Sequence, residues 1–91
     1  MLAGTGLAAA EKIVEVLVEG TVHVDKKEVL EVIQTRPGDE LTSSATAMRI
    51  RDDFRAIYAL GYFEDVTVSE EPAAGGRNLI FEVVEKPLVA D

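Results

Sequence analysis

Residues 59–65, Ala-Leu-Gly-Tyr-Phe-Glu-Asp, followed by the alternating Val66-Thr67-Val68, constrain the fold of this chain more than any other segment. Gly61 is expected to end a helix in the left-handed conformation that glycine adopts at little cost. Tyr62 and Phe63 are expected to anchor the following corner in the core. The alternation of valine with a polar residue predicts a strand with one face in solvent. None of these side chains suits a chemical reaction, so the segment favours a binding module.

Three segments have the composition of strands. Residues 12–19 are rich in valine and end at Gly20, and they predict a strand that is well buried on one face. Residues 63–69 and 79–85 predict two more strands, joined by a loose hairpin loop over residues 70–77. The residues of the first strand that are expected to share a face are Val14, Val16 and Val18.

Two helices are predicted between the first and second strands. Asp25 is the expected N-cap of the first helix, where Glu28 completes a capping box, and the turn at Pro37-Gly38 follows it. Thr42 is the expected N-cap of the second helix, which should extend to about Leu60. Its buried face is predicted to contain Ala47, Ile50, Phe54, Ile57 and Tyr58, and its outer side Arg49, Arg51, Asp52, Asp53 and Arg55.

This order of elements, β-α-α-β-β, predicts an α+β domain in which two helices cover one face of a three-stranded sheet. Residues 12–91 are expected to form this single domain, since a second domain would leave neither enough chain for a core. Residues 1–11 are expected to be a disordered leader. The leader is either a signal-peptide remnant, with the alanines at 8–10 near its cleavage site, or a vector-derived tail.

The charge and composition exclude several classes of partner and site. A net charge of −8 disfavours nucleic acids and anionic membrane surfaces, because both are bound by clusters of lysine and arginine. The absence of cysteine excludes disulfides, thiolate zinc sites and cysteine nucleophiles. No apolar run approaches the ~18 to 20 residues that span a bilayer as a helix. Proteins are therefore the expected partners.

The polar residues do not suggest an enzyme. His23, the single histidine, is predicted in a loop beside a helix cap, without the companions that a metal site requires. The adjacent carboxylates Asp52-Asp53 and Glu70-Glu71 would diverge on a helix or strand, which favours a solvated face. No glycine pattern matches a phosphate-binding loop. The sequence thus predicts no catalytic residue, no metal and no cofactor.

The predicted sheet has two open edges, and an extended partner can add to such an edge as a further strand. The segment at 63–69 has neither the lysine nor the proline that often protect an edge. Its acidic residues would discourage self-pairing, and they leave open the alternative that they only keep the domain monomeric. The candidate partner-binding residues are Glu64, Asp65, Val66, Thr67, Val68 and Ser69.

The corner Gly61-Tyr62-Phe63-Glu64-Asp65-Val66 and the closing Glu85-Lys86-Pro87 resemble, in their order and separation, those of POTRA (polypeptide-transport-associated) domains. The resemblance extends over about residues 12–90. It implies a β-α-α-β-β fold with a three-stranded mixed sheet and two helices packed on one face. It also assigns a structural motif, Gly20, Gly61, Tyr62 and Phe63.

Such domains occur as periplasmic repeats before the β-barrel of outer-membrane assembly proteins of the BamA type. The resemblance therefore implies a periplasmic location, a parent protein anchored in the outer membrane by a β-barrel, and adjacent POTRA repeats. It implies binding of unfolded outer-membrane protein precursors or accessory assembly lipoproteins, partly by strand addition at residues 64–69. The alternatives are a POTRA domain of a two-partner secretion transporter or division protein, and a structural spacer without a client.

Two features depart from the pattern of the family. Gly20-Thr21 stands where POTRA domains usually have Gly-Asn. The stretch 38–61 is about four residues longer than usual, which is roughly one helical turn and keeps the buried face in phase. The expected extra turn lies at 45–48, as a partner surface or a neutral extension.

Overall fold

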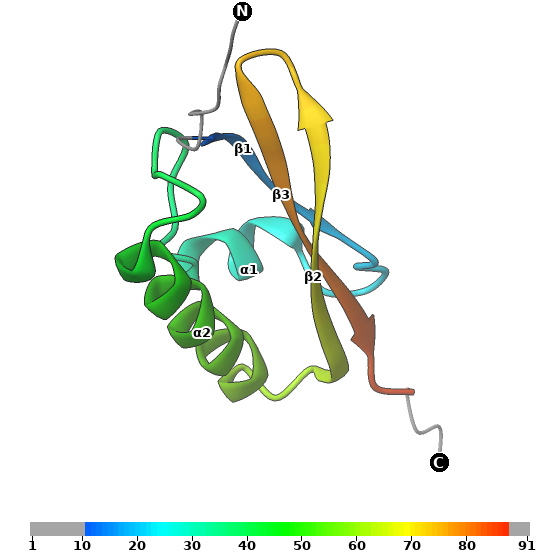
Figure 1. Cartoon of the computed structure of the whole chain (residues 1–91). Coiled ribbons are helices and arrows are strands. Elements are labelled where there is room, and N and C mark those ends of the chain that lie inside the picture. The colour runs from blue at the N-terminus through cyan, green and yellow to red at the C-terminus, as the bar shows by residue number, and fades with distance from the viewer. Residues whose placement is uncertain (1–10, 88–91) are drawn as a thin grey trace, which may run out of the picture.

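The computed structural model describes residues 11–87, which fold as a three-stranded sheet with two helices (Figure 1). The predicted order β-α-α-β-β is confirmed. The elements are β1 (Lys12–Glu19), α1 (Lys26–Val32), α2 (Ser44–Ala59), β2 (Phe63–Ala73) and β3 (Gly76–Glu85).

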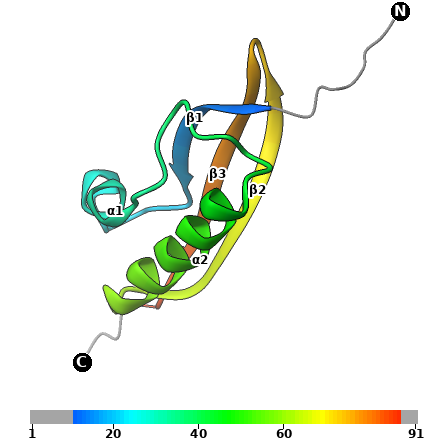
Figure 2. The same cartoon turned by 60° about the vertical axis from the view of Figure 1, so that its left-hand side comes forward.

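The sheet is mixed, and β3 lies in its centre in the order β1-β3-β2. β2 and β3 form an antiparallel hairpin, whereas β1 pairs with β3 in parallel. A parallel pair requires a long connection, and the two helices lie within it. Both helices are on the same side of the sheet (Figure 2), which confirms the predicted α+β class with two helices packed on one face.

The core lies between the inner face of the sheet and the two helices. Phe81 at the centre of β3 is fully buried, together with Leu79 and Val83 of the same strand, as their alternation predicts. Val29 of α1 and Ile57 of α2 cover them from the helical side. The remaining buried apolar members are Ile13, Val18, Ile33, Phe63 and Val66.

The alternation predicted for β1 is wrong in its first half. The pairing with β3 shifts register between Ile13 and Val16, which is the mark of a β-bulge. A bulge changes which residues face the core, so Ile13 is buried beside Val18, and Val14 is not part of the core cluster. Periodicity alone does not show where a strand contains one extra residue.

The predicted hairpin loop is also wrong, because both strands extend into it. β2 continues to Ala73 and β3 begins at Gly76, which leaves a turn of two residues. Across the extended hairpin, Arg77 Nε donates to Glu70 Oε1 at 3.2 Å. Pro72 lies in β2, an edge strand, where proline is tolerated because its missing N–H can face solvent.

The helix starts are partly as predicted. Asp25 caps α1, and its side chain accepts a hydrogen bond from the Lys27 N–H at 3.0 Å. The N-cap of α2 is Ser43, whose Oγ accepts from the Ala45 N–H at 3.1 Å, so the prediction of Thr42 is wrong by one residue. Serine and threonine are both favoured at N-caps, and their order along the chain does not distinguish them.

The buried face of α2 is rotated relative to its prediction. Ala47 is exposed, whereas Thr46 and Asp53 are each only 1% exposed. The buried stripe therefore includes an aspartate that charge patterning places in solvent. Its carboxylate accepts hydrogen bonds from the Gln34 N–H at 2.7 Å and from the N–H and Oγ1–H of Thr35. These bonds hold the chain after α1 against α2.

The predicted leader falls mostly on residues 1–10, which lie outside the described residues. Glu11 is described, and its carbonyl accepts a hydrogen bond from the Leu41 N–H at 2.8 Å. The division into a leader and one domain stays a prediction. Within residues 11–87, neither helix has the length and apolar character to cross a membrane.

Candidate partner-binding edge

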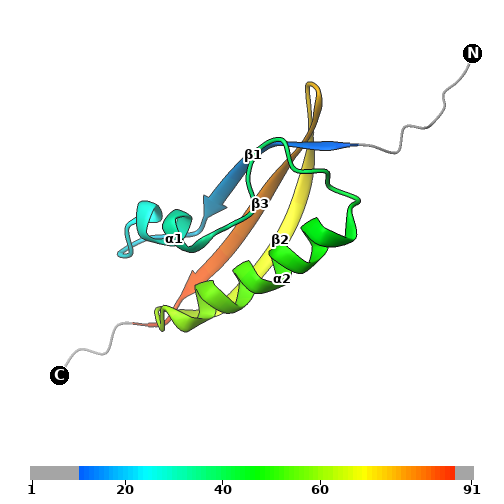
Figure 3. The same ribbon diagram turned by 90° about the vertical axis from the view of Figure 1, so that its left-hand side faces the viewer.

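The predicted edge strand does lie at an edge of the sheet. β2 pairs with β3 on one side only, and no other strand of residues 11–87 lies on its far side. α2 runs alongside β2, and α1 lies beside β1 (Figure 3). An extended chain added to β2 would therefore lie next to α2.

The opposite edge, at β1, is partly covered by the connection between the helices. Ile13 donates its N–H to the Asp39 carbonyl at 2.9 Å and accepts from the Gly38 N–H at 2.8 Å. Lys12 also forms an isolated antiparallel bridge with Glu40. Because this connection already occupies the first part of β1, β2 offers the longer open edge.

The register of the hairpin shows which main-chain groups of β2 face outward. A two-residue turn closes on a hydrogen-bonded pair, here Ala73 and Gly76. Hydrogen-bonded and non-hydrogen-bonded pairs then alternate along the ladder, so Val66, Val68 and Glu70 belong to non-hydrogen-bonded pairs. These three residues turn their N–H and C=O groups away from β3, towards the open edge.

The six candidate edge residues are therefore not equivalent. Val66 and Val68 turn their main chain to the edge and their side chains to the core. Thr67 and Ser69 direct their main-chain groups to β3. Glu64 and Asp65 are exposed and lie at a register shift, where the ladder is irregular. The sequence shows how the side chains along this strand alternate, but it does not show in which direction each main-chain amide points.

One side chain of the edge was missed by sequence reasoning. Tyr58, predicted on the buried face of α2, is 42% exposed, and its hydroxyl reaches β2. The hydroxyl oxygen accepts a hydrogen bond from the Val66 N–H at 3.0 Å, and the O–H lies 3.4 Å from Asp65 Oδ1. No sequence pattern predicts this contact, because it depends on how α2 lies against β2.

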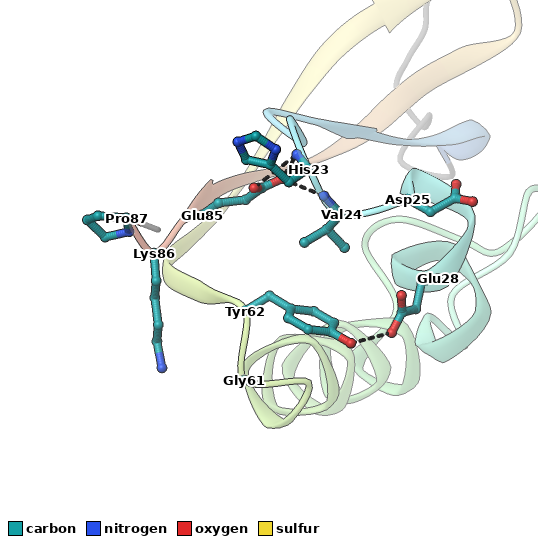
Figure 4. A pocket seen from close by; sticks show the side chains of 9 residues that line it. All are labelled: His23, Val24, Asp25, Glu28, Gly61, Tyr62, Glu85, Lys86 and Pro87. Carbon is teal, nitrogen blue, oxygen red and sulfur yellow. Dashed lines mark hydrogen bonds between the residues drawn. The ribbon is translucent and has the colours of Figure 1, made fainter. Parts of the chain in front are cut away.

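The corner between α2 and β2 agrees only in part with its prediction. Gly61 has φ +85° and donates its N–H to the Tyr58 carbonyl at 3.0 Å, which confirms the left-handed helix end. Phe63 is buried, but Tyr62 is not a core anchor, since it is 42% exposed. Its hydroxyl donates to Glu28 Oε2 at 2.9 Å (Figure 4), and this bond, with the negative charge of Glu28, raises the pKa of Tyr62.

The closing Glu85 and the strand exit at Gly20 fix the loop between β1 and α1. The Glu85 carboxylate accepts hydrogen bonds from the N–H groups of Val22, His23 and Val24. The bonds from Val22 and Val24 are the main reason that the pKa of Glu85 lies below its ordinary value. Gly20 has φ +102°, and a Cβ atom there would lie 2.0 Å from the Val83 carbonyl oxygen. Glu85 therefore ties the end of β3 to the loop, and Gly20 allows β1 to end close to the backbone of β3.

A cavity of about 560 Å³ lies beside this loop and the Tyr62 corner (Figure 4). Its carboxylates already have partners, since Glu85 binds the loop amides and Glu28 binds Tyr62. The His23 imidazole points away from the pair formed by Tyr62 and Glu28. Among residues 11–87, no group of three or more histidine or acidic side chains could hold a metal ion. Glu85 and Glu28 in this cavity therefore serve contacts that hold the loop and the corner in place.

Comparison with known proteins places the fold in a family. The POTRA family model, described as "Surface antigen variable number repeat", matches residues 11–86. The chain belongs to the POTRA family. It is 38% identical over 77 residues to the outer membrane protein assembly factor BamA of Nitratidesulfovibrio vulgaris (strain Hildenborough). That match covers 85% of this chain but 9% of the BamA protein, so the chain spans a small part of its relative.

Solved structures of POTRA domains have the same fold. The N-terminal domain of Omp85 from Thermosynechococcus elongatus superposes with a TM-score of 0.69 at 35% identity, covering 82% of this chain and 30% of that one. POTRA1-2 of the periplasmic domain of Omp85 from Anabaena gives 0.68 at 26% identity, covering 89% and 52%. These matches confirm the POTRA fold and its arrangement of helices and strands.

Proposed function

We propose that this POTRA domain is a periplasmic module of an outer-membrane protein assembly factor, and that it binds extended polypeptides by strand addition at β2. The location and the parent process are supported by the likeness to BamA and to periplasmic domains of Omp85. The observation that carries the binding mode is the open edge of β2, where alternate residues direct N–H and C=O groups away from β3.

The proposed clients are unfolded outer-membrane protein precursors, with accessory lipoproteins as further partners. An added strand would place every second side chain beside α2, near the half-buried Phe54, and the others in solvent. This arrangement favours clients with alternating apolar and polar residues. Main-chain bonds make the mode tolerant of sequence, and the cost of ordering an unfolded client keeps the affinity low.

The acidic residues near the edge add selectivity by charge. Glu64, Asp65 and Glu70 are exposed around the open part of β2. Two copies of this strand would bring like charges together, which opposes self-pairing. A neutral or basic client would not meet this repulsion, so the same residues serve both the monomeric state and client choice.

The test is an NMR titration of the labelled chain with a peptide copied from a strand of an outer-membrane barrel. Two further peptides of the same sequence carry N-methyl groups on alternate residues, in opposite phases. In strand addition only every second amide of the peptide bonds to β2. The peptide cannot turn over to use the other amides, because its apolar side chains would then face solvent. We therefore expect amide shifts at Val66, Val68 and Glu70, and loss of binding for one methylated peptide only.

Two results would contradict the proposal. Equal binding of the two methylated peptides would indicate side-chain docking rather than strand addition. Saturating peptide without any shift in β2 would indicate a spacer that only orients its neighbours. A scrambled peptide of identical composition is the control for the preference for alternation.

A further inference from the structure

The Tyr58 hydroxyl is hydrogen-bonded to the first outward-facing N–H in the regular part of β2, that of Val66. The Val66 N–H points to the open edge, and the Tyr58 hydroxyl oxygen accepts it at 3.0 Å. This is the position that a carbonyl of an added strand would take. Within residues 11–87, Val66 is the outward-facing amide of β2 that meets a side chain, whereas Val68 and Glu70 leave theirs to the open side.

We propose that Tyr58 is a displaceable cap on the β2 edge, which a client must replace in order to pair at Val66. This inference rests on the strand-addition function proposed above and adds its specificity-determining residue. The cap sets where pairing begins, because a client that does not displace Tyr58 can pair only from Val68 onwards. It also shortens the edge of the free domain, which limits unwanted pairing.

The surroundings of Tyr58 allow it to move. It lies in the last turn of α2, and its side chain is 42% exposed. Its ring stacks on that of Phe54, with centroids 6.3 Å apart and planes at 23°, and is not part of the core cluster. A change of rotamer would therefore leave the packing under β2 in place.

Asp65 orients the cap. The Tyr58 O–H lies 3.4 Å from Asp65 Oδ1, so its proton is directed to the carboxylate and an oxygen lone pair is left for the Val66 N–H. In the exchange, one acceptor at Val66 replaces another, and the freed hydroxyl can bond to water. The exchange is therefore close to balanced, and a client strand can complete it.

The chain contains a matched pair of tyrosines for the test. Tyr58→Phe removes the hydroxyl that caps the edge and keeps the ring. Tyr62→Phe changes a residue of equal exposure, 42%, and removes a hydroxyl that bonds to Glu28 away from the edge. Without the bond between Val66 and Tyr58, the peptide no longer competes for the Val66 N–H. One such hydrogen bond corresponds to about two- to tenfold in affinity, so Tyr58→Phe should bind the barrel-strand peptide about two- to tenfold more tightly. Tyr62→Phe should bind as the original chain does.

Two measurements in the unmodified chain test the cap even if a variant fails to fold. In the free protein, exchange of the Val66 amide with solvent should be slower than that of Val68. On saturation with the peptide, the ring resonances of Tyr58 should shift while those of Tyr62 remain. A Val66 amide that responds to the peptide with an unmoved Tyr58 ring would overturn the cap.

The outcomes separate the cap from the function on which it rests. Tighter binding by Tyr58→Phe alone supports both. Equal or weaker binding by Tyr58→Phe, with shifts still on β2, overturns the cap and leaves strand addition standing. No binding by the original chain or by either variant overturns strand addition, and the cap with it.

Discussion

Asp53→Ala is expected to destabilise the domain severely, although a charged residue of an amphipathic helix is usually tolerant. Asp53 is 1% exposed, and its carboxylate accepts three hydrogen bonds, from the Gln34 N–H and from the N–H and hydroxyl of Thr35. Alanine would leave these donors without an acceptor. The effect should be on the free energy of unfolding, because the three bonds join α2 to the chain that follows α1.

The magnitude follows from which donors water can reach. Gln34 is exposed, so its N–H can bond to solvent after the change. Thr35 is 1% exposed, so both its N–H and its hydroxyl would remain buried and unpaired. A buried group that loses its partner costs about 1 to 3 kcal/mol. Two such groups give roughly 2 to 6 kcal/mol, a large part of the ~5 to 15 kcal/mol that stabilises a domain.

The assay is urea unfolding followed by circular dichroism, with Asp52→Ala as the matched control. Asp52 is the neighbouring aspartate on the exposed side of α2, so its replacement should change the free energy of unfolding by at most about 0.5 kcal/mol. A loss below about 1 kcal/mol for Asp53→Ala, or equal losses for both variants, would refute the buried-carboxylate argument.

Two further predictions concern Glu85, which binds the loop between β1 and α1, and two glycines, Gly20 in that loop and Gly38 between α1 and α2. The pKa of Glu85 is lowered in the folded protein, so its carboxylate contributes to stability at neutral pH. This contribution is lost as the pH falls below 4.5, the ordinary pKa of the group, and through the lowered pKa. Glu85→Gln should therefore be less stable at pH 7 and lose less on acidification; an unchanged slope in urea unfolding from pH 7 to 3 would contradict this. Gly38→Ala, at φ +97° with open space around it, should cost about 1 to 2 kcal/mol. Gly20→Ala should cost clearly more, because its Cβ would lie 2.0 Å from the Val83 carbonyl oxygen, and equal thermal shifts for the two would refute the steric argument.

The sequence predicted only part of the candidate edge. The alternation at 63–69 correctly predicted a strand with Val66 and Val68 facing inward, and the strand order places it at an edge of the sheet. It could not show that the same two residues direct their amides outward, since that depends on the pairing with β3. The contact of Tyr58 with Val66 was likewise invisible, because a tyrosine at helical spacing is equally compatible with a core position.

Local signals therefore determined most elements of this protein, and the motifs at 61–66 and 85–87 carried the resemblance to the family. Glycine in the left-handed conformation, a capping aspartate and the period of the valines act within a few residues, so the sequence alone shows Gly61, Asp25 and β2 in these roles. Only the tertiary structure decided that Asp53 is buried and that Tyr58 covers the edge. Both depend on donors supplied by distant segments, and a polar side chain becomes a core residue or a cap only where such a donor meets it.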